Sequence, residues 1–356
     1  MKKHPYIGLP EGAYWKRAAA KSGNEFAPLV DFPFKIDRDT RVATAGSCFA
    51  QHIAKWLKRS GYRYVVIEPG HEVLSQGVRE KFQYGTFSAR YGNIYTCRQL
   101  LQLFDRAYGA YSPQETVWQL GESAFVDPFR PNVQPGGFAT REELEIDRAQ
   151  HLSSVREMFE TLDVFVFTLG LTEAWKNKED GAVYPLCPGV AGGEYDSDKY
   201  EFVNFSASEC EEDLSAFLRR LKSVNASAKV ILTVSPVPLV ATAGGNHVVQ
   251  ATTYSKSVLR VAAEALSQSD DSVAYFPSYE IICSPIMRGT YFADDLRSIT
   301  EAGVEHVMSV FSHWCLDGEQ AAEVRAEAPV EKSVGHFREE MTSIAEVLCD
   351  EELLAE

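Results

Sequence analysis

Short apolar runs alternate with amphipathic stretches along most of this chain. Runs with the length of strands lie at 41–45, 62–68, 163–170, 229–235 and within 272–282. Apolar residues recur at helical spacing in the stretches 49–57, 96–105, 140–161, 206–221, 253–266 and 300–311. Thr140 with Glu143, and Ser206 with Glu209, have the form of capping boxes and predict that helices begin there. The run at 163–170 is apolar on both faces, which is typical of a central parallel strand.

This alternation predicts an α/β fold, namely a three-layer, flavodoxin-like parallel sheet with helices on both faces. Parallel crossovers are right-handed almost without exception, which favours that arrangement. In such sheets ligands bind at the carboxyl ends of the strands. We therefore expect the functional residues to lie directly after the strands.

The alternating pattern covers residues 39–315, which we predict to form one domain. Residues 1–38 lack periodicity and are expected to pack on the body of that domain as an extension. Residues 176–205 are rich in Gly, Asp, Lys and Tyr, and predict an irregular insertion. Its tyrosines Tyr184, Tyr195 and Tyr200 are either a lid or sugar-stacking surface, or surface loop residues. Residues 316–356 are predicted to be an acidic, partly helical C-terminal tail.

Composition narrows the classes of partner. The chain has 356 residues and a formal net charge of -15. This charge disfavours nucleic acid as a partner, because an acidic protein surface and the phosphate backbone repel each other. Its 7 cysteines are scattered without CxxC spacing, which indicates a reducing compartment and no metal site. No apolar stretch follows the first lysines and no run is long enough to span a bilayer, so a cytoplasmic protein without a signal peptide is expected. Neither a Gly-x-Gly-x-x-Gly motif nor a P-loop is present, and no cofactor is predicted.

Ser47 follows the first strand at the point where a helix begins. Backbone N–H groups and the positive end of a helix dipole converge on such a position, which suits a nucleophile that passes through an anionic intermediate. The alternative is that Ser47 is an ordinary N-cap. Cys48 is a rival nucleophile, or a small buried residue.

Other strand ends carry matching groups. After the third strand, Gly170 and Thr172 are candidate oxyanion donors, although Thr172 and Glu173 also fit a helix start. In the crossover before residue 96, Gly92 and Asn93 are candidates for ligand binding or for a turn. A late carboxylate, Asp295, follows the fifth strand. A nucleophile, oxyanion donors and a carboxylate that orients a base are the parts of an acyl-transfer site.

Several motifs together resemble the GSCFA-domain family, a branch similar to SGNH/GDSL hydrolases. They are AGSCFAQHIAKWL, RYGNIYTCRQLLQLF, FTLGLTEAW, LTVSPVPL, TYSKSVLR and FPSYEII, spread over roughly residues 40–310. The resemblance implies an SGNH-hydrolase-like sheet with Ser47 as the nucleophile and Gly92 as the glycine of the second block. Gly170-x-Thr172-Glu173 stands where SGNH enzymes carry Gly-x-Asn-Asp.

The resemblance departs at its last block, because SGNH enzymes end in Asp-x-x-His whereas Ser298 stands three positions after Asp295. Ser298 with Glu301 forms a capping box for the last helix instead. The base is then sought among 8 histidines. His247, among glycines in the loop after the fourth strand, is the preferred candidate, and a solvated loop histidine is the alternative.

The leading hypothesis is a serine esterase or O-acyltransferase that forms an acyl-serine at Ser47. It implies a small-molecule or glycan substrate, that is, a saccharide or a lipid-linked ester, and the donor is either a free ester or linked to coenzyme A. One alternative is a non-catalytic protein that binds glycan or protein on the same scaffold, motivated by the missing histidine. Another is an acyltransferase that depends on Cys48.

Overall fold

The computed structural model describes residues 4–19, 32–317 and 350–354. A parallel sheet lies at its centre. In spatial order its strands are β1 (Val42–Gly46), β4 (Val164–Leu169), β8 (Lys229–Val234) and β9 (Val273–Tyr275). Every residue of β4 is buried, as expected of a central strand covered on both faces.

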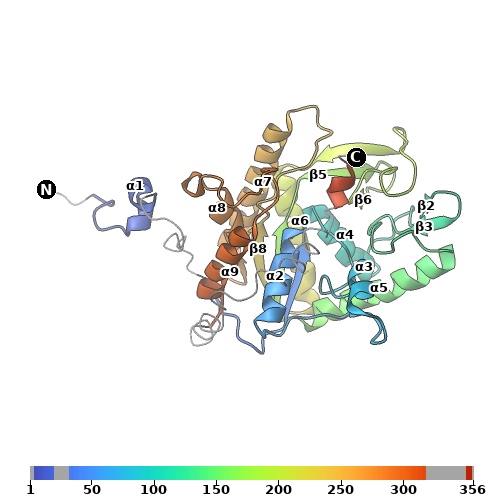
Figure 1. Cartoon of the computed structure of the whole chain (residues 1–356), viewed down its shortest axis with the longest axis horizontal. Helices are drawn as coiled ribbons and strands as arrows, with labels where there is room; N and C mark the ends of the chain where they lie inside the picture. The colour runs from blue at the N-terminus through green and yellow to red at the C-terminus, as the bar shows by residue number, and fades with distance from the viewer. Residues whose placement is uncertain (1–3, 20–31, 318–349, 355–356) are drawn as a thin grey trace.

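Helices cover both faces of this sheet (Figure 1). On one face Phe165 and Phe167 pack with α4 (Cys97–Ala107), α5 (Arg141–Thr161), α6 (Ala207–Val224) and α7 (Val248–Ser269). On the other face Val164 and Val166 pack with α2 (Phe49–Arg59), α8 (Ser278–Cys283) and α9 (Glu301–Cys315). The predicted three-layer, flavodoxin-like α/β fold is therefore confirmed.

The segment 62–68, predicted as a strand, forms only one isolated bridge of the sheet, between Tyr64 and Val42. Beyond it the chain leaves the sheet, because Ile67 N donates to Ser88 O at 2.8 Å and Glu68 Oε2 accepts from Arg90 N at 2.6 Å. These contacts pair the segment with a later crossover. The loop predicted at 69–93 also contains a short helix, α3 (Gln76–Lys81).

The insertion at 176–205 is only partly irregular. Its residues, with those just before them, form the antiparallel strands β5 (Glu173–Asn177), β6 (Val183–Tyr184) and β7 (Tyr200–Asn204), in the order β6-β5-β7. Tyr184 and Tyr200 are buried against Trp118 of the hairpin formed by β2 (Trp118–Leu120) and β3 (Ala124–Val126). They are core residues, so neither a sugar-stacking surface nor a surface loop describes them, whereas Tyr195 is exposed.

The helix ends follow the capping predictions in most places. Ser206 and Glu209 form the predicted capping box at the start of α6, and Thr140 accepts from Glu143 N at the start of α5. The prediction for the last helix is wrong, because Thr300, not Ser298, caps α9. The hydroxyl of Ser298 instead donates to Asp295.

Both flanks of the domain reach its body. Phe32, Phe34 and Ile36 are buried in the core, whereas η1 (Glu11–Ala13) and α1 (Trp15–Ala18) bury no residue. After η3 (Pro285–Met287) and α9, the described chain resumes at η4 (Asp350–Leu354), marked C in Figure 1. Most of the tail predicted at 316–356 lies outside the described residues. Within those residues, no helix has the length and apolarity that a bilayer span requires.

Candidate active site at the carboxyl edge of the sheet

Ser47 lies where β1 gives way to α2. Gly46 before it has a φ of +136°, and a Cβ on Gly46 would lie 2.3 Å from Thr168 O of the neighbouring strand. Only glycine fits this position, since an added methyl group would overlap backbone. The N–H of Ser47 donates to the same Thr168 O at 3.1 Å. This bond fixes the serine at the carboxyl edge of the sheet.

The hydroxyl of Ser47 is buried, with 4% of the residue exposed, and has no hydrogen-bond partner among the described residues. A buried unpaired hydroxyl is costly and rare, and such groups often serve a ligand. The amides of Cys48 and Phe49 follow at the start of α2, and no described residue accepts a hydrogen bond from either. Free N–H groups and the helix dipole favour negative charge at this place.

The second crossover, which contains residues 90–96, is hydrogen-bonded between the ends of β1 and β4, beside Ser47. Ile94 N donates to Gly46 O at 2.9 Å, and Tyr95 O accepts from Gly170 N at 3.1 Å. A Cβ on Gly170 would lie 3.1 Å from Ser47 Cβ. The structure therefore brings Ser47, Gly170 and the segment that contains Asn93 together. The N–H of Gly170 is used in this framework rather than left for a ligand.

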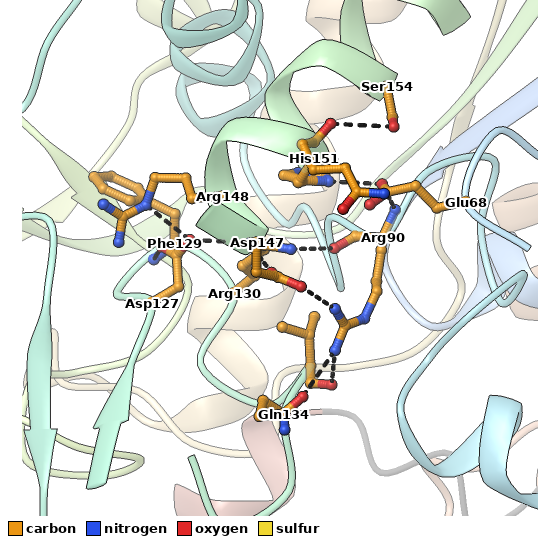
Figure 2. Close-up of polar contacts among 12 residues, drawn as sticks. Glu68, Arg90, Asp127, Phe129, Arg130, Gln134, Asp147, Arg148, His151 and Ser154 are labelled. Carbon is orange, nitrogen blue, oxygen red and sulfur yellow. Dashed lines mark hydrogen bonds and ion pairs between the residues drawn. The ribbon is translucent and has the colours of Figure 1, made fainter. Parts of the chain in front are cut away.

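A buried network of arginine and aspartate side chains holds this crossover in place (Figure 2). Arg90, 1% exposed, pairs with Asp147 at 2.7 Å and donates to the carbonyl oxygen of Val133. Gly92, two residues later, has a φ of +68°, and the nearest atom to a Cβ there would be Gln83 Oε1 at 3.8 Å, an ordinary contact. Glycine is thus favoured at this turn by its backbone conformation, and Arg90 fixes the position from which Asn93 extends.

Arg130 joins Asp147 to Asp127 in the same network (Figure 2). Burial alone would raise the pKa of Asp127, but Arg130 and Arg148 lower it more, so this pKa lies well below its usual range. His151 is buried and bonded to Glu68 at 2.8 Å. Burial, and then Arg130, lower the pKa of His151, which favours its neutral ring.

The side chains of Thr172 and Glu173 make hydrogen bonds at the start of the antiparallel sheet. The Thr172 hydroxyl donates to Asn204 Oδ1 at 2.6 Å, and its N–H donates to Ser255 Oγ. The Glu173 carboxylate accepts from Thr242 Oγ1 at 2.7 Å, and burial raises the pKa of Glu173. Neither is the start of a helix, because β5 begins at Glu173. Their predicted part in binding an oxyanion or substrate stays a prediction.

His247 caps a helix, whereas Asp295 closes a turn in the loop before α9. His247 precedes α7, and its Nδ1 accepts from Val249 N at 3.2 Å. Asp295 accepts from the N–H groups of Arg297 and Ser298, each at 2.9 Å. Among the described residues no hydrogen bond joins His247 or Asp295 to the other or to Ser47. A neutral ring that accepts at Nδ1 carries its proton on Nε2, so it would have to change tautomer to act as a base.

Lys256 is a residue at this edge that sequence reasoning missed. It lies on α7 and is 1% exposed, and its Nζ donates to Gly170 O at 2.7 Å. Its Nζ is thus buried against Gly170, the residue that packs beside Ser47. The available signal was a lysine among the apolar positions of a helix, because lysine is almost never buried without a specific partner.

Asn93 faces the C-terminal segment. Its Nδ2 donates to Asp350 Oδ2 at 2.9 Å, and Asn132 Nδ2 donates to Asp350 Oδ1 at 2.6 Å. The Asn93 Oδ1 atom is buried without a partner in the described part of the chain. Among the same residues, no group of three or more His, Cys, Asp or Glu could hold a metal ion.

Comparison with known proteins gives one family. The model of the GSCFA family matches residues 41–311, a range that runs from the start of β1 into α9 and contains Ser47, Asn93, Gly170 and Lys256. A search among curated proteins finds no match.

Proposed function

The chain belongs to the GSCFA family, and on that premise we propose that it is a serine esterase or O-acyltransferase that works through an acyl-serine at Ser47. Family membership suggests a hydrolase-like function. The observation that carries the finer proposal is the Ser47 hydroxyl, buried without a partner among the described residues at the start of α2. A serine that only capped the helix would accept a hydrogen bond from one of its first N–H groups.

In the proposed reaction Ser47 Oγ attacks the carbonyl carbon of an ester, and its proton passes to a base. The free amides of Cys48 and Phe49 stabilise the oxyanion of the tetrahedral intermediate. The intermediate collapses to an acyl-serine, and the departing alcohol takes up the proton. Water or an acceptor hydroxyl then attacks the acyl-serine, which releases an acid or a new ester and restores Ser47.

We keep His247 as the proposed base and Asp295 as the carboxylate that orients it. For this, His247 Nδ1 has to exchange its contact with Val249 N for the carboxylate of Asp295. The glycines at 244 and 245 before His247 permit that movement. The proposed substrate is an O-acylated saccharide or a lipid-linked ester, with a free or coenzyme A-linked donor.

A binding protein without catalysis is the second candidate function. The observation that favours it is the bond between Ser298 and Asp295, where an SGNH enzyme would have an Asp–His pair. Intact-mass measurement after incubation with a fluorophosphonate separates the two candidates. The esterase proposal expects one added phosphonyl group, located on the peptide that contains Ser47. A protein that stays unmodified, and that does not hydrolyse p-nitrophenyl acetate, would support the binding function.

Replacement of Lys256 should separate charge from packing at the site. We expect Lys256→Met to lower kcat for p-nitrophenyl acetate about 100-fold, the size of effect seen when one oxyanion-stabilising group is lost. KM should change little, because the charge acts on the developing oxyanion. Steady-state kinetics give this split, and Lys256→Arg should recover part of kcat. An unchanged kcat in a folded Lys256→Met protein would contradict an electrostatic role.

A further inference from the structure

The carboxyl group of Asp350 occupies a built pocket. Asp350 is 5% exposed, and its two carboxyl oxygens are each held by a different side-chain amide, from Asn93 and from Asn132. These donors come from separate parts of the chain, the second crossover and the loop before α5. An acidic side chain near a chain terminus would ordinarily lie in water, since aspartate is almost never buried unless it is paired.

The same segment also reaches the other side of the predicted site. Glu352 pairs with Arg297 Nη1 at 3.3 Å, in the loop that carries Asp295. One short element, η4, thus contacts both the Asn93 segment next to Ser47 and the loop of the predicted catalytic carboxylate. Figure 1 shows η4 against the body of the protein.

The hydrogen-bonding side chains of the pocket carry no charge. Burial raises the pKa of Asp350, and the hydrogen bonds from Asn132, Asn93 and Tyr95 lower it by less. The two amides and the Tyr95 hydroxyl are neutral donors, so they supply hydrogen bonds without a positive charge. A carboxyl group and an acyl ester each present two oxygens, of which the carbonyl oxygen is the stronger acceptor.

We propose that Asn93 and Asn132 form a subsite for the ester group of an acylated substrate, and that Asp350 fills this subsite as a built-in competitor. The inference rests on the proposed function, because it takes the ligand to be an ester that reacts at Ser47. The segment has to leave before the ester binds. The chain therefore exists in a closed state with η4 docked and an open state in which the subsite is free.

Truncation tests the competition. We compare the full chain with a protein that stops after Cys349 and with a control that stops after Leu354 and keeps η4. The first truncation should raise the rate of fluorophosphonate labelling at Ser47 about tenfold, which corresponds to a segment docked about nine times in ten. The control should label at the rate of the full chain. Equal rates in all three proteins would overturn the competition.

A peptide tests the subsite without any activity. A fluorescein-labelled peptide of residues 347–356 should bind the protein that stops after Cys349, measured by fluorescence polarisation, and should slow its labelling. Asn132→Ala in that protein should abolish peptide binding, and it strands no described group because Asn132 Nδ2 bonds only Asp350. Absence of peptide binding, or binding that Asn132→Ala leaves intact, would overturn the subsite. Binding that needs Asn132 in a protein whose Ser47 is never labelled would support the subsite and reject the acyl-serine.

Discussion

Ser47→Ala should abolish fluorophosphonate labelling and lower kcat for p-nitrophenyl acetate by at least about a thousandfold, because loss of a nucleophilic serine removes the covalent route. Stability should change little, by about 0.5 kcal/mol or less, since no described residue bonds the Ser47 hydroxyl and none loses a partner. Urea unfolding followed by tryptophan fluorescence measures the second quantity. Loss of reactivity in a protein of unchanged stability is the expected signature of a catalytic group.

Thr168→Val is the matched control. The Thr168 hydroxyl is also buried without a partner in the described structure, on the strand next to Ser47. Thr168 bonds Ser47 only through its backbone oxygen, which the substitution leaves in place. This variant should retain labelling, and loss of an unpaired hydroxyl should not destabilise it. If Ser47→Ala kept its activity while Cys48→Ala lost it, the reaction would belong to the cysteine.

The parts of the fold that the sequence predicts are those with a strong local pattern. The apolar run of β4 and the capping box of α6 each need only neighbouring residues to be recognised. The segment 62–68 has a similar apolar pattern, yet its course depends on Glu68, which turns toward Arg90 and His151. Long-range polar contacts of this kind override local preference for a strand.

The prediction of an irregular insertion at 176–205 failed for a related reason. Its strands β5, β6 and β7 pair mainly with one another, and Tyr184 is buried against Trp118 from a hairpin far along the chain. A tyrosine among glycine and charged residues reads as exposed unless its partner is known. Burial here comes from packing between two small sheets, which composition does not reveal.

The residues of the candidate site likewise fall into those that sequence reasoning predicted and those that it missed. The rule that ligands bind at the carboxyl ends of parallel strands predicted Ser47, Asn93 and Gly170 as site residues, and the structure brings their segments together. Lys256 and Asp350 were not found, because their partners lie 86 and 257 residues away. No local spacing encodes such contacts, and an acidic tail has the pattern of a solvated segment.

Asp127→Asn should lower the free energy of unfolding by about 3–5 kcal/mol at pH 7, the usual result of breaking a buried ion pair. Asp127 is 1% exposed, and its carboxylate accepts from Arg130 Nε at 3.0 Å and from Arg148 Nε at 3.1 Å. The amide keeps the shape but removes the charge, so Arg148 loses this counter-ion and Arg130 keeps only Asp147 among its described ion pairs. Because the network holds Arg90, the Asn93 segment should loosen and the rate of Ser47 labelling should fall as well.

The pH dependence gives the sign of this effect. The pKa of Asp127 is lowered in the folded protein, so its stabilisation is fully present above the unfolded value of about 4 and is lost as the pH falls through the folded value. The stability difference between the natural protein and Asp127→Asn should therefore be constant from about pH 6 to about pH 8, and it should shrink below about pH 4. Asp271→Asn, at an exposed turn, is the control and should cost less than about 0.5 kcal/mol. Equal costs for the two variants at pH 7 would mean that Asp127 does not hold the arginines together, and the network could not be what fixes Asn93 beside Ser47.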